Sequence, residues 1–97
     1  MLTNKELEKL LSDSPSPRVT EEYIKSRIRY HNFTRLGSTL TICKMEIDNG
    51  FIVTGESACV NAENYNQAIG EKIAYDNAFN KLWPLFGFLL AEKNKLQ

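Results

Sequence analysis

An Asn49-Gly50 dipeptide between two β-rich segments constrains the fold more than any other feature of the sequence. The segment before it reads TLTICKMEID and the segment after it reads FIVTGESACV, and both contain many β-branched residues. Asn-Gly is a preferred pair in the two-residue type I′ turn, because both central positions of that turn require a positive φ. The sequence therefore predicts an antiparallel hairpin in which Ile47 lies opposite Ile52.

Gly55 interrupts the second of these segments. A glycine inside a strand often marks a bulge, and a bulge here changes the facing of every residue from Glu56 onward. Without the bulge, Cys43 and Cys59 point to opposite faces of the hairpin, whereas with it they can share one face. We expect both cysteines to be structural thiols and not a disulfide.

The chain begins with a predicted short helix. Thr3 opens a capping box, and leucines recur at helical spacing over Asn4 to Leu11. The next segment, Ser12 to Arg18, contains two prolines and three serines and is typical of a linker. We therefore divide the chain into residues 1–18, an N-terminal helix with its Pro/Ser linker, and residues 19–97, a single α+β domain.

A second helix is predicted from about Glu21 to His31. Thr20 is a favourable N-cap, and apolar residues recur at helical spacing after it. His31 is interpreted as a packed or capping residue near the helix end, because the sequence places no carboxylate or nucleophile beside it. Asn32 to Ser38 is expected to be a loop.

A long C-terminal helix is predicted to begin after Asn61. Gly70, Ala74 and Ala78 recur every four residues and allow another element to approach closely. Pro84 cannot continue the hydrogen-bond ladder, so the helix should break there and a final helix should run to about Lys95. Two apolar stripes predict burial over a wide arc: Tyr65, Ile69 and Ile73 form one, and Ala68, Tyr75, Ala78, Phe79 and Leu82 form the other.

The predicted fold class is α+β, with N-terminal helices, one antiparallel hairpin and a long C-terminal helix broken near Pro84. A lone hairpin is marginally stable in water, and its open edges can pair with another strand. Two explanations are open. A weak strand lies between Phe33 and Gly37, or two protomers pair their hairpins into one larger sheet. We favour the second, which makes the protein a homo-oligomer.

Charge is distributed unevenly along the chain although the net charge is zero. Five basic residues and no acid lie between Tyr23 and Met45, whereas six acids and one lysine lie between Glu46 and Asn80. This polarity can attract an anion or join two copies, and the simpler interpretation is two solvated faces that cancel. The longest apolar run, Leu82 to Leu90, is too short to span a membrane, so we expect a cytosolic protein with no membrane partner.

The segment KSRIRYHNFTR interleaves cations with aromatic rings, a composition suited to phosphates and stacked bases. The simpler interpretation is that its aromatic residues belong to the core. The candidate ligand- or partner-binding residues are Lys25, Arg27, Arg29, Tyr30, Phe33 and Arg35. The sequence offers no catalytic constellation, no glycine-rich cofactor motif and no tetrahedral zinc site, so we expect no enzyme activity, no metal and no cofactor.

Three stretches carry a resemblance to known proteins: TICKMEI, NGFIVTGESACV and NYNQAIGEKIAYDNAFNKLWPLFGFLL. Within them, short motifs occur in the order NG, TGES, IG, AY, NA, LWPL and GF. Each motif alone is a weak signal, and only the whole set in this order is specific. From the helix at Thr20 to about Leu90 the chain resembles a family of small tailed-phage accessory proteins of the gene-49/gene-66 type, and Met1 to Arg18 lies outside the resemblance. It implies phage origin and an accessory role in the host cytoplasm, and it transfers no catalytic residue.

These features predict a non-catalytic phage accessory protein that acts by binding, as a counter-defence inhibitor or sequestering protein for a host protein or a nucleotide signal. One alternative is a nucleic-acid-binding module that uses the basic segment on phosphates, which predicts affinity that falls steeply with salt. A second alternative is a structural or virion-associated subunit that assembles without binding a small molecule or nucleic acid.

Overall fold

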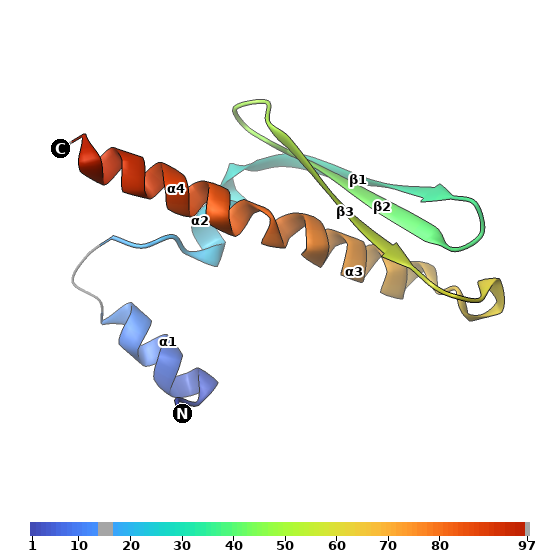
Figure 1. Cartoon of the computed structure of the whole chain (residues 1–97), viewed down its shortest axis with the longest axis horizontal. Coiled ribbons are helices and arrows are strands. Elements are labelled where there is room, and N and C mark those ends of the chain that lie inside the picture. The colour runs from blue at the N-terminus through green and yellow to red at the C-terminus, as the bar shows by residue number, and fades with distance from the viewer. Residues whose placement is uncertain (14–16, 97) are drawn as a thin grey trace.

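The computed structural model of the chain describes residues 1–13 and 17–96. Its elements are α1 (Asn4–Ser12), α2 (Glu21–Arg27), β1 (Ile28–Leu36), β2 (Leu40–Ile47), β3 (Ile52–Ala58), the 3-10 turn η1 (Ala62–Asn64), α3 (Gln67–Asn80) and α4 (Leu82–Lys95). The strands form one antiparallel sheet in the order β1-β2-β3, and α3 crosses one face of it (Figure 1). The fold is α+β, as predicted.

The first strand of the sheet corrects two predictions. The predicted helix from Glu21 to His31 ends at Arg27, and the predicted loop from Asn32 to Ser38 is strand as far as Leu36. The physical reason is that β2 lies beside this segment. It supplies antiparallel partners for Ile28 and for Tyr30 to Leu36, with one register shift at Arg29, so the strand can form its backbone hydrogen bonds there. The hairpin thus gains its third strand from the same chain, the explanation that we did not favour, and completing this sheet requires no second copy.

The hairpin between β2 and β3 is present, but its turn differs from the predicted one. Met45 lies opposite Val53, so the predicted pairing of Ile47 with Ile52 was wrong by one residue. The Ile47 amide donates to the Phe51 carbonyl over 3.0 Å, which encloses a three-residue loop. Gly50 has a φ of 91°, and no described non-glycine residue has a positive φ, which excludes type I′. This is the three-residue hairpin loop that closes on a left-handed glycine.

Gly55 does not form a bulge. Pairing between β2 and β3 runs without a shift from Leu40 opposite Ala58 to Glu46 opposite Ile52. A Cβ atom on Gly55 would lie 2.1 Å from the backbone nitrogen of Ala78, so glycine is needed because α3 sits directly on β3 at this point.

The two cysteines are free thiols, as expected. Cys43 is fully buried on the helix-facing side of β2. The Cys59 thiol lies 3.4 Å from the Asn61 carbonyl, to which it donates.

One core lies between the sheet and the helices. Alternate residues of β2 face it, since side chains alternate across a strand. The buried apolar residues are Ile24, Cys43, Met45, Ile47, Val53, Ala74, Ala78, Phe79, Leu82 and Phe86. The other face of the sheet is left uncovered by helices in Figure 1.

The long helix partly follows its prediction. It begins at Gln67 and not after Asn61, because the Asn66 side chain accepts from the Ile69 amide and caps it there, whereas Asn61 caps only η1. Gly70, Ala74 and Ala78 are buried, as their spacing indicated, and the break falls between Asn80 and Leu82, near Pro84. The predicted wide burial is wrong, because Ile69 and Ile73 are 59% and 44% exposed. The row of small residues brings one narrow face of α3 onto the sheet, and the two isoleucines remain outside that contact.

Helix α1 forms with the predicted capping box, in which Thr3 and Glu6 cap each other. All nine of its residues are exposed. The predicted Pro/Ser linker includes residues 14–16, which lie outside the described part of the chain.

Candidate functional site

The six residues predicted as a binding site do not share one surface. Their segment is mostly a strand, so successive side chains point to opposite faces. Tyr30 lies on the open face, where the Lys44 ammonium is 5.6 Å from its ring centroid. Phe33 and Arg35 lie on the helix-facing side, and the Arg35 guanidinium sits 3.7 Å from the Tyr65 ring centroid. The nine-residue strand spans about 26 Å from its first to its last Cα at ~3.3 Å per residue, so residues at its two ends lie far apart.

Three of the four predicted cations are paired with acids, and the fourth, Arg35, donates to the Ser38 carbonyl. Lys25 lies 3.8 Å from Glu21. Arg27 Nε lies 2.8 Å from an oxygen of Asp48. Arg29 forms an ion pair with Glu46. The charge asymmetry of the sequence is therefore largely cancelled where α2 and β1 meet the end of β2.

Arg27 alone among the six lines a groove of about 410 Å³ between α2 and α4. We call it the α2–α4 groove. It is lined by Arg18, Val19, Tyr23, Arg27, Phe86, Leu89, Leu90 and Lys93.

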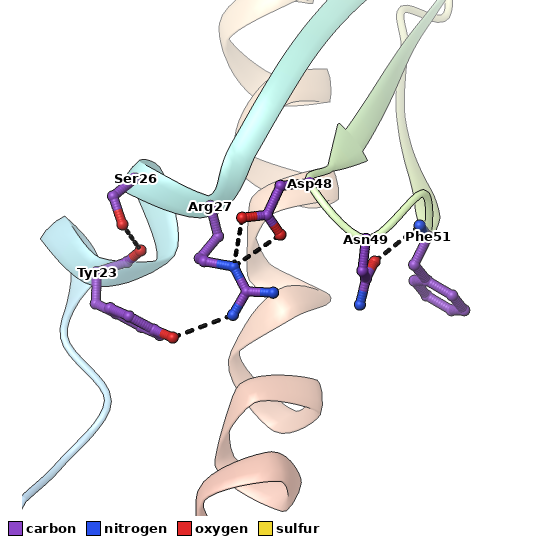
Figure 2. A network of polar contacts seen from close by, with 6 residues as sticks. All are labelled: Tyr23, Ser26, Arg27, Asp48, Asn49 and Phe51. Atoms are coloured by element: carbon purple, nitrogen blue, oxygen red, sulfur yellow. Dashed lines mark hydrogen bonds and ion pairs between the residues drawn. The ribbon is translucent and has the colours of Figure 1, made fainter.

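Arg27 is held rigidly at one wall of this groove. Its Nε donates to both carboxylate oxygens of Asp48 over 2.8 Å, and its Nη1 donates to the Tyr23 hydroxyl over 3.1 Å (Figure 2). Its guanidinium carbon lies 5.3 Å from the ring centroid of Phe86, within cation–π range. The hydrogen bond to Asp48 raises the pKa of Arg27 above its ordinary value, so the side chain stays charged.

The other walls of the groove supply two further cations and an aromatic pair. Arg18 Nε donates to the Leu11 carbonyl over 3.0 Å, and Lys93 lies in the last turn of α4. The rings of Tyr23 and Phe86 meet edge to face, with centroids 5.9 Å apart. Cations beside aromatic walls suit an anion that carries a flat apolar group.

Arg18 and Lys93 line the groove but are not among the site residues predicted from the sequence. They lie near opposite ends of the chain, and the packing of α4 beside α2 brings them to one groove (Figure 1). No local pattern marks either residue, because each is an ordinary cation next to a linker or at a helix end.

A second, smaller pocket of about 110 Å³ lies between the sheet and the start of α3. At this pocket Thr41 Oγ1 and the Tyr65 hydroxyl share a hydrogen bond of 3.1 Å. His31 is on β1 and not at a helix end, and its ring lies 5.0 Å from that of Tyr75. Over residues 1–13 and 17–96, no three His, Cys, Asp or Glu side chains gather as they would around a metal ion.

The model of the phage protein (N4 Gp49/phage Sf6 gene 66) family matches residues 19–94. The chain belongs to this family. The matched span includes α2, the sheet, α3 and all of α4 except its last residue, and it leaves out α1. All but one of the residues that line the α2–α4 groove therefore lie within the family region, and Arg18 precedes it.

No curated protein and no solved structure matches the chain. Among the described residues, no helix combines the length and apolar character that crossing a membrane requires.

Proposed function

We propose that this phage protein acts in the host cytoplasm by binding and not by catalysis, as a counter-defence protein that sequesters a nucleotide signal or inhibits a host protein. The α2–α4 groove is the proposed contact site. Family membership supports the phage setting, and the charge and shape of the groove favour an anionic ligand with a flat ring, as in a nucleotide.

The observation that carries the proposal is the fixed position of Arg27. Asp48 and Tyr23 hold its guanidinium in place before any ligand arrives, so little side-chain entropy is lost when an anion binds. Arg18 and Lys93 add positive charge on the other walls. The groove volume of about 410 Å³ lies within the usual range for small-molecule sites.

The composition of the groove also supports binding without catalysis. Its eight lining residues include no carboxylate, thiol, imidazole or aliphatic hydroxyl. Carboxylates, imidazoles, thiols and aliphatic hydroxyls are common general bases and nucleophiles, so the groups of the lining that could take such a role are the Tyr23 phenol and the Lys93 amine. Asp48 lies nearby, but both of its oxygens accept hydrogen bonds from Arg27.

Calorimetric titration of the full chain with AMP, ATP, a cyclic dinucleotide and inorganic phosphate tests the proposal. We expect at least one nucleotide to bind more tightly than inorganic phosphate, because the aromatic walls add stacking. Lys93→Ala should weaken that binding about tenfold, or ~1.4 kcal/mol. Arg29→Ala is the matched control, since Arg29 pairs with Glu46 outside the groove. The site assignment fails if Arg29→Ala weakens binding as much as Lys93→Ala.

A second candidate function rests on the open face of the sheet. Tyr30 is 42% exposed there, and the Lys44 ammonium lies over its ring. An exposed ring beside a cation can stack on a base of single-stranded nucleic acid. This candidate predicts that Tyr30→Ala weakens binding of an oligonucleotide and that affinity falls steeply with salt, because counterions are released. A chain that binds no nucleotide, no oligonucleotide and no host protein would fit the remaining alternative, a structural or virion-associated subunit.

A further inference from the structure

Helix α1 carries an apolar stripe that faces solvent. Leu7, Leu10 and Leu11 follow the i, i+3, i+4 spacing that places side chains on one helix face. They are 45%, 56% and 39% exposed. A nine-residue helix is marginal in water by itself, so its stability depends on packing that this stripe can supply.

Helix α4 carries a stripe with the same spacing. Leu85, Phe88 and Leu89 are 39%, 66% and 49% exposed, although α4 is otherwise anchored by the buried Leu82 and Phe86. The stripe borders the α2–α4 groove, because Leu89 also lines that groove. In Figure 1, α4 continues past the end of the sheet, so the sheet does not cover this part of the helix.

The charges beside the two stripes are complementary. On α1, Glu6 and Glu8 lie to either side of the leucine stripe, each about 100° around the helix from Leu7. On α4, Lys93 and Lys95 lie in the last turn, one to each side of the apolar stripe, and the single carboxylate of Glu92 lies between them in line with Leu85. Packing the two stripes together therefore sets carboxylates beside ammonium groups.

We propose that α1 of a second copy packs on the Leu85–Phe88–Leu89 stripe of α4. The exchange is reciprocal, so two copies form a dimer with two identical contacts, the usual geometry of an isologous pair. Within one chain, the hydrogen bond from Arg18 to the Leu11 carbonyl holds the C-terminal end of α1 near Arg18, which precedes α2. Figure 1 shows α1 standing clear of α4 of its own chain, which leaves the stripe of α4 open to another molecule.

The proposed contact between α1 of one copy and α4 of the other adds to the proposed function but does not depend on it. A partner helix over Leu89 would add a wall to the α2–α4 groove, and the occupant of that groove does not alter the contact between the two stripes. The dimer can therefore be tested without any ligand.

Cysteine cross-linking between separately prepared chains tests which molecule supplies α1. In a Cys59→Ser background, Leu11→Cys protein is mixed with Leu89→Cys protein and oxidised. We expect a disulfide-linked heterodimer. The matched control is Lys9→Cys mixed with Leu89→Cys, since Lys9 lies on the opposite face of α1, and this pair should cross-link much more slowly. Equal rates for both pairs would overturn the proposal. A chain with both Leu11→Cys and Leu89→Cys that cross-links only within itself would also overturn it.

Native mass spectrometry of the full chain provides the second measurement. The unaltered protein should have twice the mass of one chain, and Leu7→Glu combined with Leu11→Glu should raise the dimer dissociation constant at least about tenfold. Lys5→Ser combined with Lys9→Ser alters the opposite face of α1 and should leave the dimer intact. A monomeric unaltered protein contradicts the proposal. A dimer that survives the paired leucine changes would place the interface elsewhere, for example at the open edge of β3.

Discussion

Gly55 of β3 and Ala78 of α3 meet with no side chain between them. A Cβ atom on Gly55 would lie 2.1 Å from the Ala78 nitrogen and 2.3 Å from the Ala74 carbonyl oxygen. Backbone atoms of a helix cannot move aside as the end of a flexible side chain can. This contact therefore sets how closely α3 lies against the sheet, and the position of α4 and the α2–α4 groove follows from it.

Gly55→Ala should lower the free energy of unfolding by about 3 kcal/mol or more, because overpacking against backbone forces the helix away from the sheet. Urea denaturation measures the change. Gly87→Ala is the matched control, since a Cβ atom there meets nothing within 4 Å. In the middle of α4 that change should instead stabilise the protein by about 0.5–1 kcal/mol. Equal effects of the two substitutions would show that Gly55 is not a close-contact site.

The Arg27–Asp48 pair should couple the end of α2 to the hairpin loop. In a double-mutant cycle with Arg27→Ala and Asp48→Ala, we expect a coupling free energy of about 1 kcal/mol that decreases with added salt. The Lys72–Asp76 pair, at the same 2.8 Å, is the control. Its lysine side chain is 73% exposed against 25% for Arg27, so its coupling should be clearly smaller. Similar coupling in both cycles would contradict a structural role for Arg27.

Gly50→Ala should destabilise the hairpin by about 1 kcal/mol, because alanine is strained at the positive φ of 91°. Gly50→Asn should cost less, since asparagine tolerates the left-handed region better than alanine. Thermal unfolding of both variants provides the comparison. If alanine and asparagine cost the same, conformational strain at this position is not the cause.

Burial raises the pKa of the Cys43 thiol above its ordinary value. The folded protein therefore keeps a proton that the unfolded chain releases, so the free energy of unfolding should fall as pH rises above the ordinary thiol pKa. Burial also raises the pKa of Tyr75, which acts in the same direction. Denaturation of Cys43→Ala over the same pH range should show a shallower fall.

A thiol-reactive dye gives an independent check on the two cysteines. Cys59, which is partly exposed, should react in the native protein, and Cys43 should react only on unfolding. Rapid labelling of both thiols in the native state would contradict the buried position of Cys43.

The candidate site depends on which residues face the same way and on contacts between residues that are distant in the sequence. The cations and rings between Lys25 and Arg35 are close in sequence, which predicts one binding surface. In a strand, neighbours in sequence point to opposite faces, so Tyr30 and Phe33 are separated by the sheet itself. Arg27 pairs with Asp48 and Arg29 pairs with Glu46. Both acids lie at or just after the C-terminal end of β2, about twenty residues later in the chain, so no local sequence pattern predicts these pairs.

The sequence by itself determined the features that depend on neighbouring residues: the helix starts after Thr3 and Thr20, the hairpin around Asn49-Gly50 and the break near Pro84. These follow from capping, backbone preference and a missing amide donor, all of which act within a few residues. Only the tertiary structure decided that residues 28–36 form a strand, because their backbone partners lie on β2. The α2–α4 groove also depends on the tertiary structure. Arg18, Arg27 and Lys93 line one groove because α3 packs on Gly55 and thereby positions α4 beside α2.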